Sequence, residues 1–171
     1  RAAFMQQGST VDMNVWKEKI QRLPMVTEVL HNYYHPMISK VMISSQIAQW
    51  EGNEQRLEHP IPMTTFLATE EFFKFYDITL LAGEWLHGLS TKEDIIINES
   101  LARKLGWSAE EAIGKHFRGY SGSIEYKIIG VVKDCHYGPP TSKMLNVAFI
   151  ADDMTGMCFW NTCVFFKYKE G

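Results

Sequence analysis

Hydrophobic and polar residues follow two periods in the first part of the chain, one typical of a helix and one typical of strands. A hydrophobic face that ends at Pro24 predicts a helix over residues 9–24, and its members are Val11, Val15, Trp16, Ile20 and Leu23. Three later segments are rich in Val, Ile, Thr, Tyr and Trp, which favour half-buried strands. These expected strands cover residues 26–36, 39–52 and 54–68, with a turn at Gly52 between the last two.

The period changes abruptly within residues 94–105, where we expect a strand to run directly into a helix. The apolar run of residues 94–98 has strand character, and Asn98 is suited to cap the helix that follows. Gly106 stands where a helix commonly ends in a left-handed residue. The helix places three apolar residues on one face, which are Leu101, Ala102 and Leu105.

Two more short helical segments are expected on either side of this unit. Thr69 is suited to cap a helix over residues 69–76. Ser108 and Glu111 match a capping box that opens a single helical turn, which Gly114 closes. The remaining segments are expected to be strands: a hairpin over residues 115–134 that turns around 119–123, an extended segment over 77–86, and strands over 143–152 and 158–170. The pattern predicts a mixed chain with many strands, three or four helices and no regular alternation of the two.

Composition and charge exclude some classes of function. The chain has 171 residues, 46% of them hydrophobic and 22% charged, with a net charge of −3. Basic residues are scattered, which argues against a nucleic-acid partner, because such proteins gather them on one face. The sequence holds no apolar stretch of about 18 residues that would span a bilayer. We interpret the chain, which starts at Arg1, as a piece of a longer protein, so the absence of a spanning stretch describes this piece alone and leaves a membrane protein open as its parent.

Cysteine and histidine residues raise the possibility of catalysis or metal binding. Cys135 and His136 are neighbours at the end of a strand, so their side chains point to opposite faces and do not form a dyad easily. We expect Asp134 and His136 to form a hydrogen bond there and Cys135 to pack inward. The histidine spacing elsewhere predicts no metal site, and the scattered glycines predict no phosphate site or cofactor. A disulfide between Cys158 and Cys163 would require a turn between them, and the pattern leaves this open.

Four segments in the middle of the chain, taken in order, carry a family resemblance. They read FFKFYDITLLAGEWL, DIIINESLARKLGW, EEAIGKHFR and YKIIGVVKDCHYGPP. Together they resemble the extracytoplasmic core domain of MacB-type ABC transporter permeases, the group with FtsX-like membrane helices, in a form similar to that of Bacteroidetes-type bacteria. The residues of these segments that we take as structural motif positions are Asn98, Gly106, Trp107, Gly114, Gly130, Asp134 and His136.

The resemblance implies an α+β domain with two lobes, placed between the first and second membrane helices of a permease. A mixed α/β, porter-like lobe near the membrane would consist of residues 1–68 and 135–171, and its second part would be truncated. A β-rich lobe would be inserted over residues 69–134. Crossings between the lobes would lie near residues 66–72 and 132–137. Asp134 and His136 would fix one crossing, with Cys135 as a core residue there.

The resemblance also implies a mechanical function without a catalytic residue, cofactor or metal in this chain. A separate cytoplasmic ABC ATPase would hydrolyse ATP, the protein's own membrane helices would transmit the motion, and a second permease subunit would complete a dimer. The domain would lie on the periplasmic side of the inner membrane and act in efflux or mechanotransmission, with a periplasmic adaptor or other periplasmic protein as a further partner. Two alternatives remain open: a sensor or interaction domain of a permease that does not transport, and a hydrolase that uses Cys135 and His136.

Overall fold

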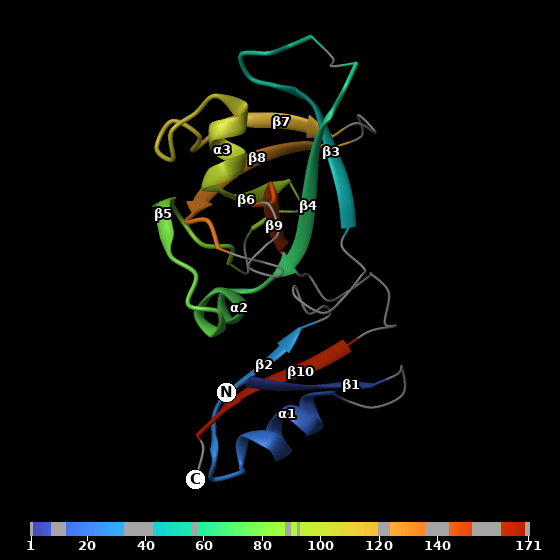
Figure 1. Cartoon of the computed structure of the whole chain (residues 1–171), viewed down its shortest axis with the longest axis vertical. Helices are drawn as coiled ribbons and strands as arrows, with labels where there is room; N and C mark the ends of the chain where they lie inside the picture. Colours follow the sequence, from blue (N-terminus) through green and yellow to red (C-terminus); the bar gives the residue numbers. More distant parts are fainter. Residues whose placement is uncertain are drawn as a thin grey trace.

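The computed structural model describes residues 2–7, 13–32, 43–55, 58–87, 90–91, 93–119, 124–135, 144–151 and 162–169. Within this part of the chain the elements follow the order β1 (Ala2–Gln7), α1 (Met13–Gln21), β2 (Val26–Asn32), β3 (Ile43–Trp50), β4 (Ile61–Ala68), α2 (Glu70–Phe75), β5 (Leu80–Gly83), β6 (Asp94–Asn98), α3 (Glu99–Leu105), β7 (His116–Gly119), β8 (Glu125–Val132), β9 (Val147–Ala151) and β10 (Thr162–Tyr168). They form two sheets, one above the other in the view of Figure 1.

The smaller sheet is built from both ends of the chain. Its strands follow the order β1-β10-β2, and β10 is antiparallel to both neighbours, so β1 and β2 are parallel. Helix α1 lies between β1 and β2 in sequence, which makes this a βαβ unit split by an inserted strand. Ile20 of α1 and Val164 of β10 are buried together and form the centre of a small core. Partly buried residues complete that core: Trp16, Val26, Val29 and Phe166.

The larger sheet has seven strands in the order β5-β8-β6-β9-β4-β3-β7, and β7 also pairs with β8. This extra pairing closes six strands into a ring, because β8 has β6 on one side and β7 on the other. Strand β5 pairs with the last residues of β8, on the edge of β8 that also pairs with β7. Closure of the ring leaves these six strands without a free edge along most of their length, which protects them from pairing with other chains.

One apolar cluster takes residues from every strand of the ring and therefore fills its inside. Its members from the strands include Ile47, Met63, Ile95, Phe117, Ile128 and Ala148. Helix α3 adds Leu101, Ala102 and Leu105, each almost completely buried. Because Ile96 faces the opposite side of β6 and is buried as well, the centre of the strand is apolar on both faces. This explains the uninterrupted run of isoleucines at residues 95–97.

A second apolar cluster covers the outside of the ring and joins the two sheets. Helix α2 contributes Phe72, Phe73 and Phe75, and the ring contributes Phe66 and Phe149 among others. Leu30 of β2 and Phe165 of β10 belong to the same cluster, although both lie in the smaller sheet. Helix α2 lies between the two sheets (Figure 1).

Most of the elements expected from the sequence pattern are confirmed. The helix expected over residues 9–24 is described over Met13–Gln21, and the hairpin, the strand-to-helix unit and the short helix after Thr69 are all present. Strand β1 was not predicted. The mixture of helices and strands is confirmed as well, whereas the division into two lobes stays a prediction.

The two sheets divide the chain at different places from the expected lobe boundaries at 68/69 and 134/135. Strands β3 and β4, which precede residue 69, pair in the larger sheet, as does β9, which follows residue 134. The chain therefore passes from one sheet to the other between residues 32 and 43 and again between 151 and 162. The sheet boundary differs from the expected lobe boundary because β4 lies between β3 and β9 in the larger sheet. The pairing of β4 with β9 joins strands that are distant in sequence. No helix in the described part of the chain is long and apolar enough to cross a membrane.

Candidate functional site

Asn98 stands at the end of β6, where its buried side chain makes a complete set of hydrogen bonds. Its Oδ1 accepts from the backbone N–H of Leu101 at 3.3 Å, which caps α3, and from the backbone N–H of Val147 at 2.8 Å. Its Nδ2 donates to Oδ1 of Asp134 at 2.6 Å and to the carbonyl of Leu145 at 2.9 Å. An amide can make four such bonds, so burial of this polar side chain leaves no donor or acceptor unsatisfied.

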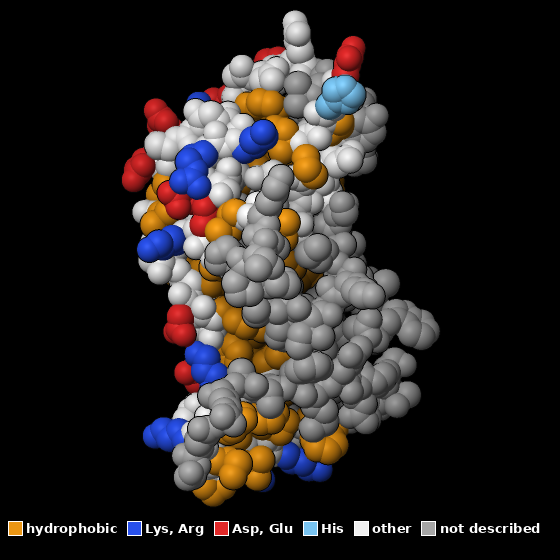
Figure 2. Space-filling model, in the orientation of Figure 1, with side chains coloured by type: hydrophobic (Ala, Val, Ile, Leu, Met, Phe, Trp, Pro, Cys, Tyr) orange, Lys and Arg blue, Asp and Glu red, His pale blue; other side chains and the backbone are white. Residues whose placement is uncertain are grey.

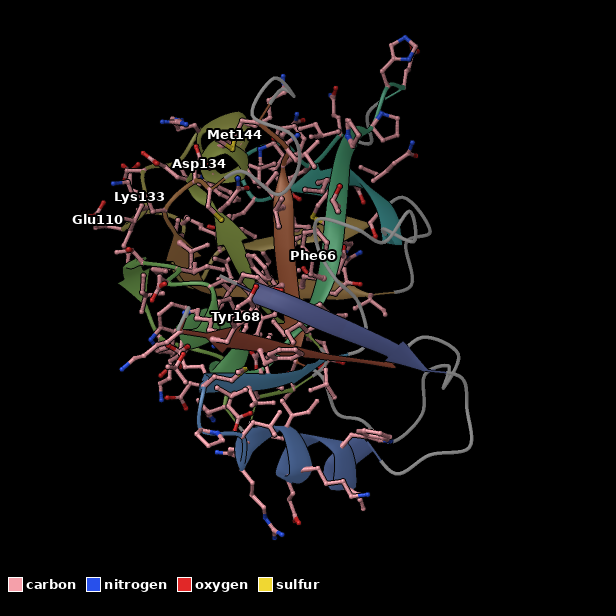
Figure 3. All side chains as sticks on the ribbon, turned by 60° about the horizontal axis from the view of Figure 1, so that its bottom comes forward. Phe66, Glu110, Lys133, Asp134, Met144 and Tyr168 are labelled. Atoms are coloured by element: carbon pink, nitrogen blue, oxygen red, sulfur yellow. The ribbon has the colours of Figure 1, made fainter. Side chains whose placement is uncertain are left out.

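Asp134 follows β8 and receives the hydrogen bonds of α3 on both carboxylate oxygens. Oδ1 accepts from the backbone N–H of Ser100 at 2.9 Å, in addition to the Asn98 amide. Oδ2 accepts from the Ser100 hydroxyl at 2.6 Å and from the Arg103 guanidinium at 2.9 Å. Figure 3 shows Asp134 beside this helix. A carboxylate at the first turn of a helix is also favoured by the helix dipole, so Asp134 holds the start of α3 against the end of β8.

His136 lies outside the described residues, so the expected pairing of Asp134 with His136 is not tested. The crossing between lobes that this pair was expected to fix likewise stays a prediction, but it is not a crossing between the two sheets. The chain goes from β8 to β9 there, and both strands belong to the larger sheet. Asp134 joins parts of one sheet because its partners Asn98, Ser100 and Arg103 follow β6 directly.

The other motif positions have structural explanations. Gly106 ends α3 with a φ of 91°, in the left-handed region that favours glycine. Gly114 donates its backbone N–H to Ile128 at 2.8 Å, which ties the turn after Ser108 to β8. In that turn Ser108 and Glu111 exchange the two hydrogen bonds of a capping box, which lower the pKa of the Glu111 carboxyl. Trp107 is half-buried and packs against the cluster inside the ring.

Gly130 lies where two strands approach too closely for a side chain. It pairs with Gly83 of β5, and a Cβ added at Gly130 would lie 2.5 Å from the backbone oxygen of Glu84. The same Cβ would lie 3.1 Å from Cγ1 of Ile96. The glycine is therefore required by packing between β8 and its neighbours.

The junction between the two sheets is the best candidate for a functional site. Its apolar centre is the α2 part of the outer cluster, in which the ring of Phe72 lies 5.8 Å and that of Phe73 5.1 Å from the ring of Phe149. Leu30 and Phe165 extend this centre into the smaller sheet, with 1% and 2% of their surface exposed. The two sheets are thus joined by a continuous dry core.

Ion pairs surround this apolar centre. Lys167 of β10 reaches Glu28 of β2 at 3.0 Å and Asp77, which follows α2, at 3.4 Å. Its ammonium group also lies 5.1 Å from the centroid of the Phe75 ring. Burial acts to lower the pKa of Lys167, but hydrogen bonds and attraction from Glu28 and Asp77 outweigh it, so the net pKa is raised.

A second bridge of this kind joins α1 to α2. The ammonium group of Lys17 lies 3.0 Å from a carboxylate oxygen of Glu71. Lys167 therefore reaches from the smaller sheet, and Lys17 from its helix α1, to α2 and the residues that follow it. These ion pairs, together with the packing of Phe72 and Phe73 on Phe149 of the ring, bring α2 and the residue that follows it into contact with both sheets. Sequence analysis did not find this site, since its residues are far apart in the chain.

The features that would support catalysis or metal binding are weak. The described residues contain no group of three acidic, histidine or cysteine side chains placed to hold a metal ion. Cys135, which was expected to pack inward, is partly buried and packs against the outer cluster. Cys158 lies outside the described residues, as does the side chain of Cys163, so their expected alternatives are not tested.

A cavity of about 260 Å³ lies at the end of the larger sheet, away from the junction. Its lining includes Glu51, which pairs with Lys115, and Arg118, whose guanidinium lies 2.9 Å from the Glu125 carboxylate. The hydrogen bond from Lys115, together with its charge, lowers the pKa of Glu51. Two of the lining carboxylates, those of Glu51 and Glu125, are thus each paired with a basic side chain, and nothing in this arrangement identifies a nucleophile.

Comparison with known proteins supports the resemblance seen in the sequence. The model of a family described as the MacB-like periplasmic core domain matches residues 3–162. A comparison with curated proteins gave no match. Among solved structures, a domain assigned to a permease protein of Porphyromonas gingivalis superposes with a TM-score of 0.64 at 18% identity, covering 99% of this chain and 74% of that one.

Two further solved structures share the fold. The extracellular domain of the ABC-type transporter YknZ from Gram-positive bacteria has a TM-score of 0.59 at 13% identity, with 99% of this chain and 84% of that chain covered. The periplasmic region of MacB from Actinobacillus actinomycetemcomitans has a TM-score of 0.54 at 11% identity, with 97% and 67% covered. At these identities the superpositions establish the fold alone.

Proposed function

The chain belongs to the family of MacB-like periplasmic core domains, and from this premise we propose that it transmits movement between the membrane helices of an ABC permease and the periplasm. In this proposal a cytoplasmic ATPase supplies the energy, and the extracytoplasmic domains of two permease subunits move against each other. The family is one of transporter permeases and not of enzymes, which agrees with the mechanical role.

The observation that carries this proposal is the continuous core between the two sheets. A domain that transmits force must move as one body, because a soft joint would absorb the displacement. Here Leu30 and Phe165 of the smaller sheet are buried in the same cluster as Phe72 of α2. Packed cores deform little, so motion applied to the smaller sheet would reach the ring.

We assign the two expected lobes to the two sheets. The smaller sheet with α1 would be the membrane-proximal, porter-like lobe, and the larger sheet of residues 43–151 would be the inserted lobe. In this arrangement the chain before Ala2 continues from one membrane helix, and the chain after the smaller sheet continues, through further residues, to the next. The inserted lobe would then be the part that meets the second subunit or a periplasmic adaptor.

The proposal is tested in the full-length permease with its ATPase, reconstituted in a bilayer. Spin labels at Glu110 in the larger sheet region and at the exposed Glu18 of α1, on the smaller sheet, would report distances within one subunit and between two subunits. We expect the distance within a subunit to stay constant when ATP binds, and the distance between subunits to change. An unchanged distance between subunits in all nucleotide states would contradict the proposal.

A pair of matched variants separates transmission from folding. Phe165→Ala removes a side chain from the junction, whereas Phe117→Ala removes the same side chain from the inside of the ring. Both are expected to cost stability, about 3 to 5 kcal/mol. Only the junction variant should broaden the distribution of the distance between the two labels within a subunit. Equal broadening of that distance in both folded variants would show that the junction has no special role.

A further inference from the structure

The turn between α1 and β2, residues 22–25, holds apolar side chains in solvent. Leu23 and Met25 are 49% and 59% exposed, the two highest values among the large hydrophobic side chains in the described part of the chain. The turn is well ordered by hydrogen bonds, from the N–H of Leu23 to the carbonyl of Ile20 at 3.1 Å and from the N–H of Val26 to the carbonyl of Leu23 at 3.0 Å. These side chains therefore cannot fold back into the small core without breaking the turn.

Basic side chains surround this turn. Lys19 precedes it on α1, Arg22 begins it, and Lys169 lies beside it, while Glu18 is the acidic neighbour, 3.9 Å from Arg22. All four residues are exposed. Figure 2 shows hydrophobic side chains gathered at the end of the molecule occupied by α1, with Lys and Arg beside them. The turn is thus locally positive, whereas the whole chain has a net charge of −3.

The turn lies at the end of the smaller sheet where β1 begins and β10 ends. The N–H of Lys169 donates to the carbonyl of Met25 at 2.9 Å, and Ala2 pairs with Lys167. Figure 1 shows the N and C marks close together at this end, next to the turn. Because β1 and β2 are parallel and α1 returns between them, the α1–β2 turn must come back to the end where β1 starts.

We propose that the turn of residues 22–25 is a contact with the lipid bilayer, in which Leu23 and Met25 enter the headgroup region and the surrounding basic residues bind anionic lipid. This inference rests on the proposed function, in which the chain before Ala2 continues from a membrane helix. Apolar tips flanked by Lys and Arg are the composition of segments that bind at a membrane interface. Long basic side chains reach anionic headgroups near the surface, and each raises the affinity about fivefold.

The contact would fix the orientation of the domain. Two side chains give weak binding on their own, since each buried methylene raises the affinity only about fourfold. A domain tethered at the membrane needs no more, because the tether supplies a high local concentration. The turn would then act as a second support point next to the tether, so that tilting of the membrane helix moves the whole domain.

The test uses this chain attached by an N-terminal histidine tag to vesicles of phosphatidylcholine, phosphatidylglycerol and a nickel-chelating lipid. A benzophenone amino acid replaces Met25, and after irradiation the adducts are identified by mass spectrometry. The matched control has the same probe in place of Ile124, which is 43% exposed and directly precedes β8, a strand of the larger sheet that lies away from α1 (Figure 1). We expect lipid adducts at position 25 and not at position 124.

Second substitutions separate the apolar and ionic parts of the contact. Leu23→Ser should reduce the adducts at position 25 about tenfold, the change that loss of about two buried methylenes gives. Arg22→Gln with Lys169→Gln should reduce them on vesicles that contain phosphatidylglycerol and have little effect on vesicles of phosphatidylcholine and the nickel lipid alone.

Several outcomes would overturn the inference. Equal lipid adducts at positions 25 and 124 would show random collision with the vesicle, and the absence of lipid adducts at position 25 would show that the turn stays in water. Adducts with a second copy of the chain would identify a protein interface instead. None of these outcomes bears on the transmission of movement, which is measured with ATP in the full-length permease.

Discussion

Nδ2 of Asn98 donates a hydrogen bond to Oδ1 of Asp134 across 2.6 Å, although the two residues are 36 positions apart. Asn98 joins β6 to α3, and Asp134 follows β8, the strand that lies beside β6. The same asparagine also binds Leu145 and Val147, which lead into β9. One buried amide therefore holds three adjacent strands and the start of a helix in register.

Asn98→Asp is expected to destabilise the protein strongly at neutral pH. The substitution replaces two donors by an acceptor and places a second carboxylate against Asp134 in a buried position, at a cost of about 3 kcal/mol or more. Burial and the neighbouring charge should raise the pKa of the introduced carboxyl. Protonation relieves the repulsion, so the deficit relative to wild type should shrink as the pH falls. Urea unfolding at several pH values measures this.

Arg103→Ala is the matched control for this network. Its guanidinium reaches Asp134 at 2.9 Å, but the side chain is 60% exposed. Its removal should therefore cost less than about 1 kcal/mol. If Arg103→Ala and Asn98→Asp cost the same, the ion pair and not the buried amide would be the stabilising element.

The network also shows what the sequence pattern can predict and what it cannot. Asn98 as a helix cap and Gly106 as the helix end follow from neighbouring residues, and both are confirmed. The partner of Asp134 could not be found in this way. His136, two positions further along the chain, was the obvious candidate, whereas Asn98 and Ser100 reach Asp134 only because β6 and β8 pair in the fold.

The sheets themselves were harder to predict than their strands. Strand β4 was expected in the first lobe because it comes before the short helix that starts after Thr69. Its place is decided by pairing with β9, which is more than 70 residues away in the chain: Ala68 lies opposite Ala151. Strand β1 was missed because its place depends on β10, from the other end of the chain. The junction between the sheets has the same origin, since Leu30, Phe72 and Phe165 come from three distant segments.

Gly130→Ala should destabilise the protein more than Gly106→Ala. At Gly130 the new Cβ would meet backbone, 2.5 Å from the oxygen of Glu84, so the strands must shift, at a cost of about 1 to 3 kcal/mol. At Gly106 the φ of 91° is unfavourable for alanine, but the space around it is open, and the cost is about 1 kcal/mol. Thermal unfolding of both variants gives the comparison. The reverse order would show that β5 and β8 adapt easily at this position.

Cys135 should react with a thiol reagent in the native state, but more slowly than in the unfolded chain. Its side chain is partly buried against the outer cluster, so the reagent has restricted access to the thiol. Mass spectrometry of peptides after short labelling separates Cys135 from Cys158 and Cys163. Labelling of Cys135 as fast in the folded as in the unfolded protein would contradict its packing and would reopen the hypothesis of a reactive thiol.

Lys167→Met should destabilise the protein at neutral pH, and the difference from wild type should vanish at alkaline pH. Methionine keeps the apolar stem against Phe75 but loses the bridges to Glu28 and Asp77, which together contribute about 1 kcal/mol for a partly exposed group. The pKa of Lys167 is raised in the folded protein, so the protonated side chain favours folding. This contribution is complete below the ordinary value of 10.5 and is lost as the pH rises through the higher folded pKa.

Lys74→Met is the control, because Lys74 pairs with Glu70 on the exposed side of α2 and should matter much less. Urea unfolding of the three proteins from neutral pH to above 10.5 measures the effect. A deficit of Lys167→Met that stays constant over this range would mean that packing at the junction, and not the charge of Lys167, holds the two sheets together.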